Sequence, residues 1–214
     1  MKERKTLVQC DFDGTITIED ASFTILDAYI PGEWQSLFEK YQQGKMTVGE
    51  FNSTVFTMVK ADKETLLEII REKISVREGF RDLMEYCRLK DYRFVIVSNG
   101  LDFYIEDILG RNGFTDVEVH ASNTIFGEGG LIVRHRGPDG HHLDTDVKAA
   151  YTDYFRGQGY RIIYLGDGRS DVTPARKSHY IFATDSLVEY CKTAKISCTP
   201  FTDFHQVIQV MESW

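Results

Sequence analysis

The sequence predicts an α/β fold in which a mostly parallel sheet is flanked by helices, with a helical unit inserted after the first strand. Two observations predict it. From residue 78 onward, helical and strand-like segments alternate, which is typical of a parallel sheet wrapped by helices. Before that point, residues 17–77 carry helical periodicity and no strand signal. The chain therefore reads as one α/β domain with an insertion.

The first strand is an apolar run at residues 7–10 that leads into Asp11-Phe12-Asp13-Gly14-Thr15. Alternation along a strand places Asp11 and Asp13 on one side and Phe12 on the other. Two like charges this close are unfavourable unless a cation lies between them or one is protonated. Gly14 lets the backbone turn without a Cβ penalty. We interpret the pair as metal-binding and catalytic carboxylates; the alternative is an acidic turn on the surface.

The inserted segment predicts four short helices at residues 21–30, 33–43, 47–59 and 62–74. Pro31-Gly32 and Gly44 separate the first three of them. We expect them to form a cap domain at residues 17–77, joined by two short crossings to a core domain at residues 1–16 and 78–214. The alternative is that these helices simply pack on the core.

The rest of the chain supplies the remaining elements of the predicted core. Helices are expected at residues 79–91, 102–111, 144–156, 171–177, 186–192 and 203–212. Strands are expected at residues 93–97, 117–121, 161–165 and 179–183, and a hairpin at residues 123–136 with its turn at Gly127-Glu128-Gly129-Gly130. The pair His141-His142 lies in a turn-rich loop, where we expect it to face solvent.

Composition excludes several classes of function. The 214 residues are 42% hydrophobic, enough for a proper core, and carry a net charge of −8. Since the only basic block is at residues 2–5, no nucleic-acid footprint is visible. No apolar run is long enough to span a membrane, and the N-terminus lacks the apolar region of a signal peptide. The four cysteines are scattered without a Cys-x-x-Cys pair, which favours free thiols and a cytoplasmic location.

Polar residues follow the other predicted strands at the edge where ligands bind in parallel sheets. Ser98-Asn99-Gly100 follows one strand and offers a hydroxyl and loop N–H groups for an anion. Gly166-Asp167-Gly168-Arg169-Ser170-Asp171 follows another and brings two more carboxylates. Lys148 lies near the start of the helix before that strand. Each signal is weak alone, but together they indicate carboxylates for a cation beside donors for a phosphate.

In this order the motifs resemble those of the haloacid dehalogenase (HAD) superfamily of phosphohydrolases. The resemblance covers essentially the whole chain and implies a Rossmann-like core with a helical C1-type cap. The insertion and hairpin resemble the phosphoserine-phosphatase-like branch. Short segments at residues 10–17, 77–81 and 199–205 are similar to the methionine-salvage phosphatases that act on 2-hydroxy-3-keto-5-methylthiopentenyl-1-phosphate.

The resemblance implies a role for each motif residue. Asp11 would be the nucleophile that forms an aspartyl-phosphate, and Asp13 the general acid and base. Asp11, Asp13, Asp167 and Asp171 would hold the metal, for which oxygen ligands favour Mg²⁺. Residues that would bind the transferring phosphoryl group are Ser98, Asn99, Gly100 and Lys148.

The insertion gives less information about the substrate. Glu19, Asp20 and Phe23 follow the first motif closely enough to overhang the site, and Phe51, Phe56 and Met58 offer apolar surface for a thioether tail; ordinary packing is the alternative. No arginine occurs between Arg4 and Arg71, so the insertion lacks a guanidinium for a substrate carboxylate, which argues against phosphoserine. The alternative source of that cation is one of four lysines: Lys40, Lys45, Lys60 and Lys63.

The sequence therefore predicts a Mg²⁺-dependent phosphatase of a small-molecule phosphate monoester, with no nucleic-acid or membrane partner. Phosphoserine phosphatase, another small-metabolite phosphatase and a phosphotransferase that uses the same aspartyl-phosphate are the alternatives. A catalytically silent binding module is a further one, but it would leave the full motif set unexplained. The oligomeric state is not predicted.

Overall fold

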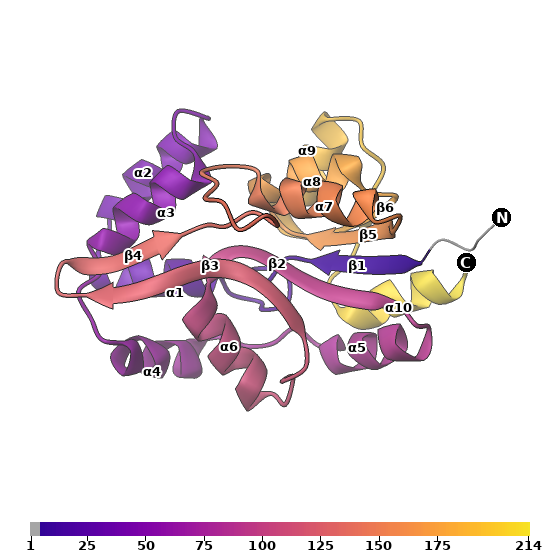
Figure 1. Ribbon diagram of the computed structural model, residues 1–214, viewed down its shortest axis with the longest axis horizontal. Helices are drawn as coiled ribbons and strands as arrows, with labels where there is room; N and C mark the ends of the chain where they lie inside the picture. Colours follow the sequence, from indigo (N-terminus) through magenta and orange to yellow (C-terminus); the bar gives the residue numbers. More distant parts are fainter. Residues whose placement is uncertain (1–4) are drawn as a thin grey trace.

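The computed structural model describes residues 5–214, so most of the basic block at residues 2–5 and the start of the expected core domain lie outside the described part. Within residues 5–214, seven strands form one sheet in the order β4-β3-β2-β1-β5-β6-β7 (Figure 1). The strands are β1 (Thr6–Cys10), β2 (Arg93–Leu101), β3 (Glu118–Gly127), β4 (Gly130–Arg134), β5 (Arg161–Gly166), β6 (Tyr180–Ala183) and β7 (Thr199–Pro200). Only the pairing of β3 with β4 is antiparallel. The predicted α/β class is confirmed.

Helices cover both faces of the sheet (Figure 1). One face carries α5 (Phe80–Leu89), α6 (Asp102–Arg111) and α10 (Phe204–Glu212); the other carries α7 (Val147–Gly157), α8 (Val172–Lys177) and α9 (Asp185–Thr193). The central strand β1 is buried throughout and alternates between the two layers. Leu7 packs in the cluster with Phe155 of α7, whereas Val8 packs in the cluster with Phe80 of α5. This double burial explains why Leu7, Val8 and Cys10 are apolar. The buried Gln9 is polar, but its side-chain amide donates to the Lys148 carbonyl and accepts from the Thr152 hydroxyl.

Four helices follow β1 before α5: α1 (Ala21–Tyr29), α2 (Glu33–Gln42), α3 (Val48–Thr57) and α4 (Lys63–Lys73). The side chains of Asp20, Thr47 and Asp62 cap α1, α3 and α4 by accepting hydrogen bonds from first-turn N–H groups. The chain enters and leaves this segment side by side, because Thr17 and Val76 form an antiparallel bridge. The expected helical insertion is confirmed; its limits at residues 17–77 stay a prediction.

The structure corrects several element boundaries. The strand expected to end at Val97 continues to Leu101 as β2, although its register with β3 shifts after Val97. The strand and hairpin arm expected at residues 117–136 form one long β3 that turns back at Gly127 into β4. The short β7 was not expected. Helix α7 starts at Val147, three residues late, because the preceding Asp146 adopts a left-handed conformation at φ 55°.

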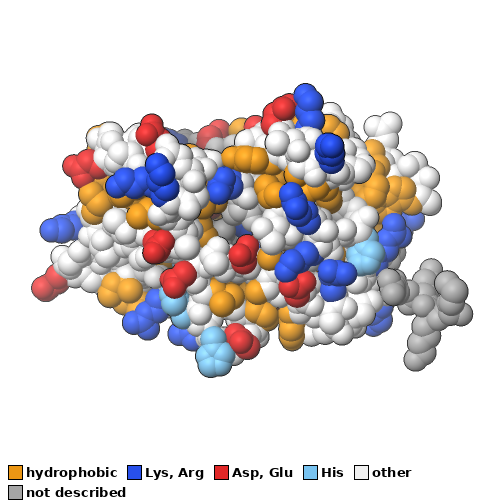
Figure 2. Space-filling model, turned by 90° about the horizontal axis from the view of Figure 1, so that it is seen from above, with side chains coloured by type: hydrophobic (Ala, Val, Ile, Leu, Met, Phe, Trp, Pro, Cys, Tyr) orange, Lys and Arg blue, Asp and Glu red, His pale blue; other side chains and the backbone are white. Residues whose placement is uncertain are grey.

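Four further expectations can be compared with the structure. In the part of the chain that is described, no helix is long and apolar enough to cross a membrane. On the face seen from above, basic and acidic side chains of the described residues are interspersed, and they do not gather into a basic patch (Figure 2). His141 and His142 are exposed, as expected. The four cysteines are free thiols.

Candidate active site

The polar residues that follow the strands meet in one cavity. This cavity of about 210 Å³ opens where the carboxyl ends of β1, β2 and β5 face helices α1 to α3. The sequence-predicted residues in its lining are Asp11, Asp13, Asp20, Phe23, Ser98, Asn99, Gly100, Lys148 and Asp167. Asp171 lies next to this lining and is fully buried. Glu19 does not reach the cavity: its carboxylate accepts a hydrogen bond from the backbone N–H of Ser75.

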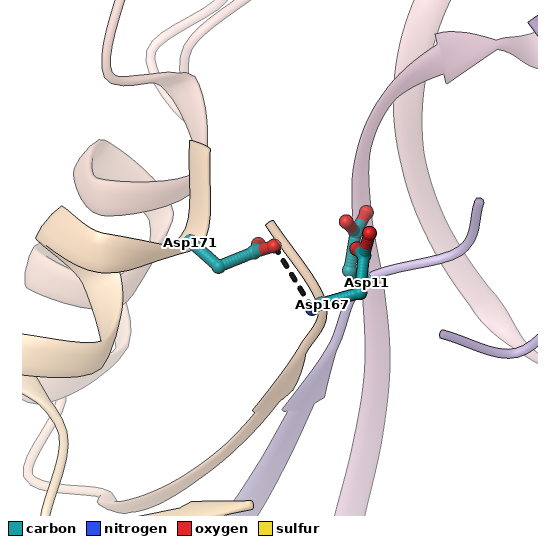
Figure 3. Close-up of side chains that lie close together, drawn as sticks. All are labelled: Asp11, Asp167 and Asp171. Atoms are coloured by element: carbon teal, nitrogen blue, oxygen red, sulfur yellow. Dashed lines mark hydrogen bonds between the residues drawn. The ribbon is translucent and has the colours of Figure 1, made fainter. Parts of the chain in front are cut away.

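Three carboxylates form an acidic cluster beneath the cavity (Figure 3). One carboxylate oxygen each from Asp11, Asp167 and Asp171 lies within 4.8 Å of the others. Asp11 comes from the end of β1, and the other two come from the turn after β5. Burial, and then the charges of its two neighbours, raise the pKa of Asp167 well above its usual range. Hard oxygen donors this close fit a divalent cation such as Mg²⁺, which would relieve their mutual repulsion.

Asp171 organises the turn that carries Asp167. Its Oδ2 accepts hydrogen bonds from the N–H groups of Gly168 at 2.9 Å and Asp167 at 3.2 Å. Its Oδ1 accepts from the Tyr164 hydroxyl at 2.5 Å and from Lys148 Nζ at 2.7 Å. Both carboxylate oxygens of Asp171 already accept hydrogen bonds. Asp171 is therefore better placed to orient the other metal ligands than to be the main ligand itself.

Lys148 is buried among these carboxylates in the first turn of α7. Its Nζ donates to Asp11 Oδ2 at 2.5 Å, to Asp171 Oδ1 at 2.7 Å and to Ser170 Oγ at 2.8 Å. Burial alone would lower the pKa of Lys148, but the surrounding carboxylates outweigh it and raise the pKa. Burial raises the pKa of Asp11 to about 6, with Lys148 acting in the opposite direction. The ammonium is therefore charged and holds the Asp11 carboxylate in place.

Asp13 lies in the same cavity with different partners. Its Oδ2 accepts a hydrogen bond from the Tyr104 hydroxyl at 2.6 Å, and its Oδ1 accepts from the N–H of Ala21 at 3.0 Å. Ser22 in turn contacts the Tyr104 hydroxyl at 2.8 Å. Burial raises the pKa of Asp13 to about 7, although the Tyr104 hydrogen bond lowers it. A carboxyl group that titrates near neutral pH can both donate and accept a proton.

The donors after β2 differ from the expected loop. Ser98, Asn99 and Gly100 lie inside the irregular end of the strand, and the Gly100 N–H donates to Ser98 Oγ at 2.9 Å. The carbonyl of Asn99 is held by Asn52 of α3 at 3.0 Å and by Ser122 of β3 at 2.9 Å. The expected loop is thus the end of β2, and the Gly100 N–H is engaged by Ser98 Oγ; the phosphate-binding role of Ser98, Asn99 and Gly100 stays a prediction.

An aromatic wall closes the cavity from the side of the inserted helices. Its members pack against one another and are Phe23, Phe38, Tyr41 and Phe51. Of the apolar residues expected to face a substrate tail, Phe51 lines the cavity, whereas Phe56 and Met58 pack in the hydrophobic core. Asp20 also lines the cavity, and burial, with the charge of Asp13, raises its pKa to about 8.

The second cation of the cavity does not come from the inserted helices. All four candidate lysines, Lys40, Lys45, Lys60 and Lys63, are exposed. Instead, Arg169 of the turn after β5 lines the cavity, and its guanidinium lies 5.7 Å from the centre of the Tyr41 ring. Arg169 was not expected here, because the sequence places it in a core motif and not in the insertion. Tyr104 and Ser22 were not expected either, because both have the pattern of ordinary helical packing positions.

Comparison with known proteins agrees with this geometry. A family model described as haloacid dehalogenase-like hydrolase matches residues 8–176. The chain belongs to this family. It is therefore a HAD hydrolase, as the motifs predicted, and its fold and motif set are those of a phosphatase of small phosphate monoesters.

Curated relatives match this HAD hydrolase over nearly their full length. A 2-hydroxy-3-keto-5-methylthiopentenyl-1-phosphate phosphatase of Brevibacillus brevis is 26% identical over 98% of this chain and 96% of the relative. A protein of the same name from Bacillus pumilus is 29% identical over 88% and 83%. Among solved structures, a phospho-aspartyl intermediate analogue of phosphoserine phosphatase superposes with a TM-score of 0.74 at 18% identity, over 97% of this chain and 99% of that one. The last likeness shows the fold alone.

Gly100 gives a first test of this HAD site. A Cβ at Gly100 would lie 2.2 Å from Asp13 Oδ2 and 2.3 Å from the Tyr104 hydroxyl. We expect Gly100→Ala to lower kcat about a hundredfold, because Asp13 must move and misplacement by about an ångström costs that much. Gly110→Ala is the matched control, since a Cβ at Gly110 meets nothing within 4 Å. Steady-state kinetics of both variants check this; equal activities would contradict the packing of Gly100 against Asp13.

Proposed function

We propose that this HAD hydrolase cleaves its phosphate monoester in two steps through a phosphoryl group carried on Asp11, with bound Mg²⁺. The observation that carries the proposal is that Asp11 and Asp13 line the same cavity with different partners. Lys148 holds Asp11, whereas Tyr104 and the Ala21 N–H hold Asp13. One carboxylate is thus paired with an ammonium and the other with a hydroxyl and a backbone N–H group, which separates the nucleophile from the acid.

In the first step, an Asp11 oxygen attacks phosphorus and the bond from phosphorus to the leaving oxygen breaks. Asp13 gives its proton to that oxygen, so the leaving group departs as an alcohol. In the second step, Asp13 takes a proton from water, which attacks phosphorus and breaks the bond to Asp11. Lys148 and Ser98 are placed to hold phosphoryl oxygens, whose charge preorganised donors stabilise in the transition state.

The residues present fit the metal that this mechanism needs. Asp11 and Asp167 would supply carboxylate oxygens, the backbone carbonyl of Asp13 would add a further ligand, and Asp171 would orient the site. The bound cation supplies positive charge that lets the Asp11 carboxylate approach an anionic phosphate. Thr15 positions Asp167, because its hydroxyl donates to Asp167 Oδ1 at 3.2 Å.

We further propose 2-hydroxy-3-keto-5-methylthiopentenyl-1-phosphate as the substrate. Relatives bearing that name match nearly the whole chain. The aromatic wall of Phe23, Phe38 and Phe51 provides apolar surface for a methylthio tail. The alternatives are phosphoserine and other small metabolites, and transfer of the phosphoryl group to an alcohol instead of water. The predicted cytoplasmic location belongs with this proposal, since it suits a small-metabolite enzyme.

The substrate assignment is tested by phosphate release from a panel of monoesters with Mg²⁺. We expect kcat/KM to be highest for the methylthiopentenyl phosphate, at least about tenfold above phosphoserine, because phosphoserine leaves the aromatic wall unused. Excess EDTA is expected to remove activity on every substrate, and added Mg²⁺ to restore it. A preference for phosphoserine would contradict the substrate assignment. Phosphorylated alcohol in the presence of added glycerol would identify a phosphotransferase.

A further inference from the structure

Arg169 lies at the junction of two adjoining cavities. Beside the catalytic cavity is a second one of about 430 Å³, between the end of α2 and the first turn of α7. Residues that border both cavities are Tyr41, Val48, Asn99, Lys148, Arg169 and Ser170. The catalytic cavity therefore continues past the phosphate-binding end into space where the guanidinium of Arg169 stands. A leaving group that extended from the phosphate into the second cavity would meet Arg169 at the boundary between the two.

The charges around this junction leave Arg169 available to a ligand. The lining of the catalytic cavity contains four carboxylates, those of Asp11, Asp13, Asp20 and Asp167, but only two cations, Lys148 and Arg169. Lys148 already donates to three protein groups. Within residues 5–214, no carboxylate forms an ion pair with Arg169, whose guanidinium faces the Tyr41 ring. A half-buried guanidinium with unused donors favours an acceptor oxygen of a ligand.

We propose that Arg169 is a specificity-determining residue that binds an acceptor oxygen on the leaving group, either a ketone close to the phosphate or a carboxylate. This proposal rests on the proposed phosphatase function and names the substrate class more narrowly. Arg169 belongs to the core turn that also carries Asp167, and Asp171 holds the backbone of that turn by accepting hydrogen bonds from the N–H groups of Asp167 and Gly168. Selection therefore depends on the leaving group's oxygen, while Phe23, Phe38 and Phe51 contribute apolar contact in the same cavity.

The experiment compares three phosphates in the parent and in Arg169→Gln. Dihydroxyacetone phosphate carries a ketone, phosphoglycolate carries a carboxylate, and propyl phosphate carries neither. For the parent we expect kcat/KM to be higher with one of the first two than with propyl phosphate. In Arg169→Gln, kcat/KM for that substrate is expected to fall about 10- to 100-fold, which corresponds to the loss of one hydrogen bond from a charged donor. For propyl phosphate, kcat/KM is expected to change less than about threefold. The substrate that loses activity identifies the oxygen.

Controls separate this role from a purely structural one. Arg71→Gln removes a different contact between the core and the inserted helices, the ion pair of Arg71 with Asp107 at 2.6 Å, and Arg71 lines neither cavity. Arg176→Gln removes one positive charge from the exposed surface of α8. Both are expected to retain the parent's selectivity. Equal losses on all three phosphates in Arg169→Gln would overturn the proposal and make Arg169 a contact between core and insertion. Absence of activity in the parent would instead refute the phosphatase function.

Discussion

Replacement of Asp11 by Asn is expected to lower kcat by at least about a thousandfold, because the amide is not a nucleophile. The Lys148 ammonium would still donate to Asp171 and Ser170, so it remains paired and the fold is expected to survive. Phosphate release by the purified variant, measured with saturating Mg²⁺, checks the loss. Circular dichroism and a thermal melt check that the variant is folded.

The matched control for Asp11→Asn is Asp27→Asn, an aspartate of α1 whose carboxylate accepts from the Trp34 indole and lies outside the lining of the catalytic cavity. That variant is expected to retain the parent's activity. If a folded Asp11→Asn enzyme kept activity within tenfold of the parent, the assignment of Asp11 as nucleophile would be wrong.

Replacement of Asp13 by Asn should produce a loss that depends on the leaving group. The Asn side chain can still accept from Tyr104 but has no proton to give, so alkyl phosphates are expected to lose about 10²- to 10⁴-fold in kcat/KM. Nitrophenyl phosphate needs little protonation because its leaving group is already acidic, and its loss is expected to be smaller. Parallel assays of both ester types measure the difference.

Tyr104→Phe tests the hydrogen bond to Asp13 separately from the Asp13 carboxyl group. It removes the hydroxyl that donates to Asp13 Oδ2 but leaves the carboxyl group itself. We expect kcat/KM to lie between that of the parent and that of Asp13→Asn, and the loss to be larger for alkyl phosphates than for nitrophenyl phosphate. Should alkyl and nitrophenyl phosphates lose activity equally in Asp13→Asn, the acid role would belong to another group.

The site residues that could be located from the sequence are those that directly follow predicted strands. Asp11, Asp13 and Asp167 were placed correctly because parallel strands end at one edge, where their last residues must gather. The two layers of helices were expected for a related reason: β1 is buried on both faces, and Leu7, Val8 and Cys10 in it are apolar. Ser98 to Gly100 showed the limit: the turn composition predicted a loop, but pairing with β3 extends the strand to Leu101.

Side-chain contacts between segments that are distant along the chain could not be predicted from the sequence. Tyr104 has the pattern of a core residue of an amphipathic helix, and only the packing of α6 against β2 and β3 brings its hydroxyl to Asp13. Arg169 stands in a core motif, yet it lines the cavity next to Tyr41 of the inserted α2. Glu19 illustrates the reverse error: its closeness to Asp13 along the chain suggested a role in the site, but the backbone turns it towards Ser75.

The central claim is that the phosphoryl group passes through Asp11, and a rapid acid quench tests it directly. The parent enzyme is mixed with substrate and Mg²⁺, quenched within one turnover, digested and analysed by mass spectrometry. We expect the peptide that contains Asp11 to gain the mass of one phosphoryl group, which hydroxylamine removes, and the Asp11→Asn enzyme to show no such gain. Steady turnover without any phosphorylated Asp11 peptide, or with the phosphoryl group on another residue, would contradict the mechanism.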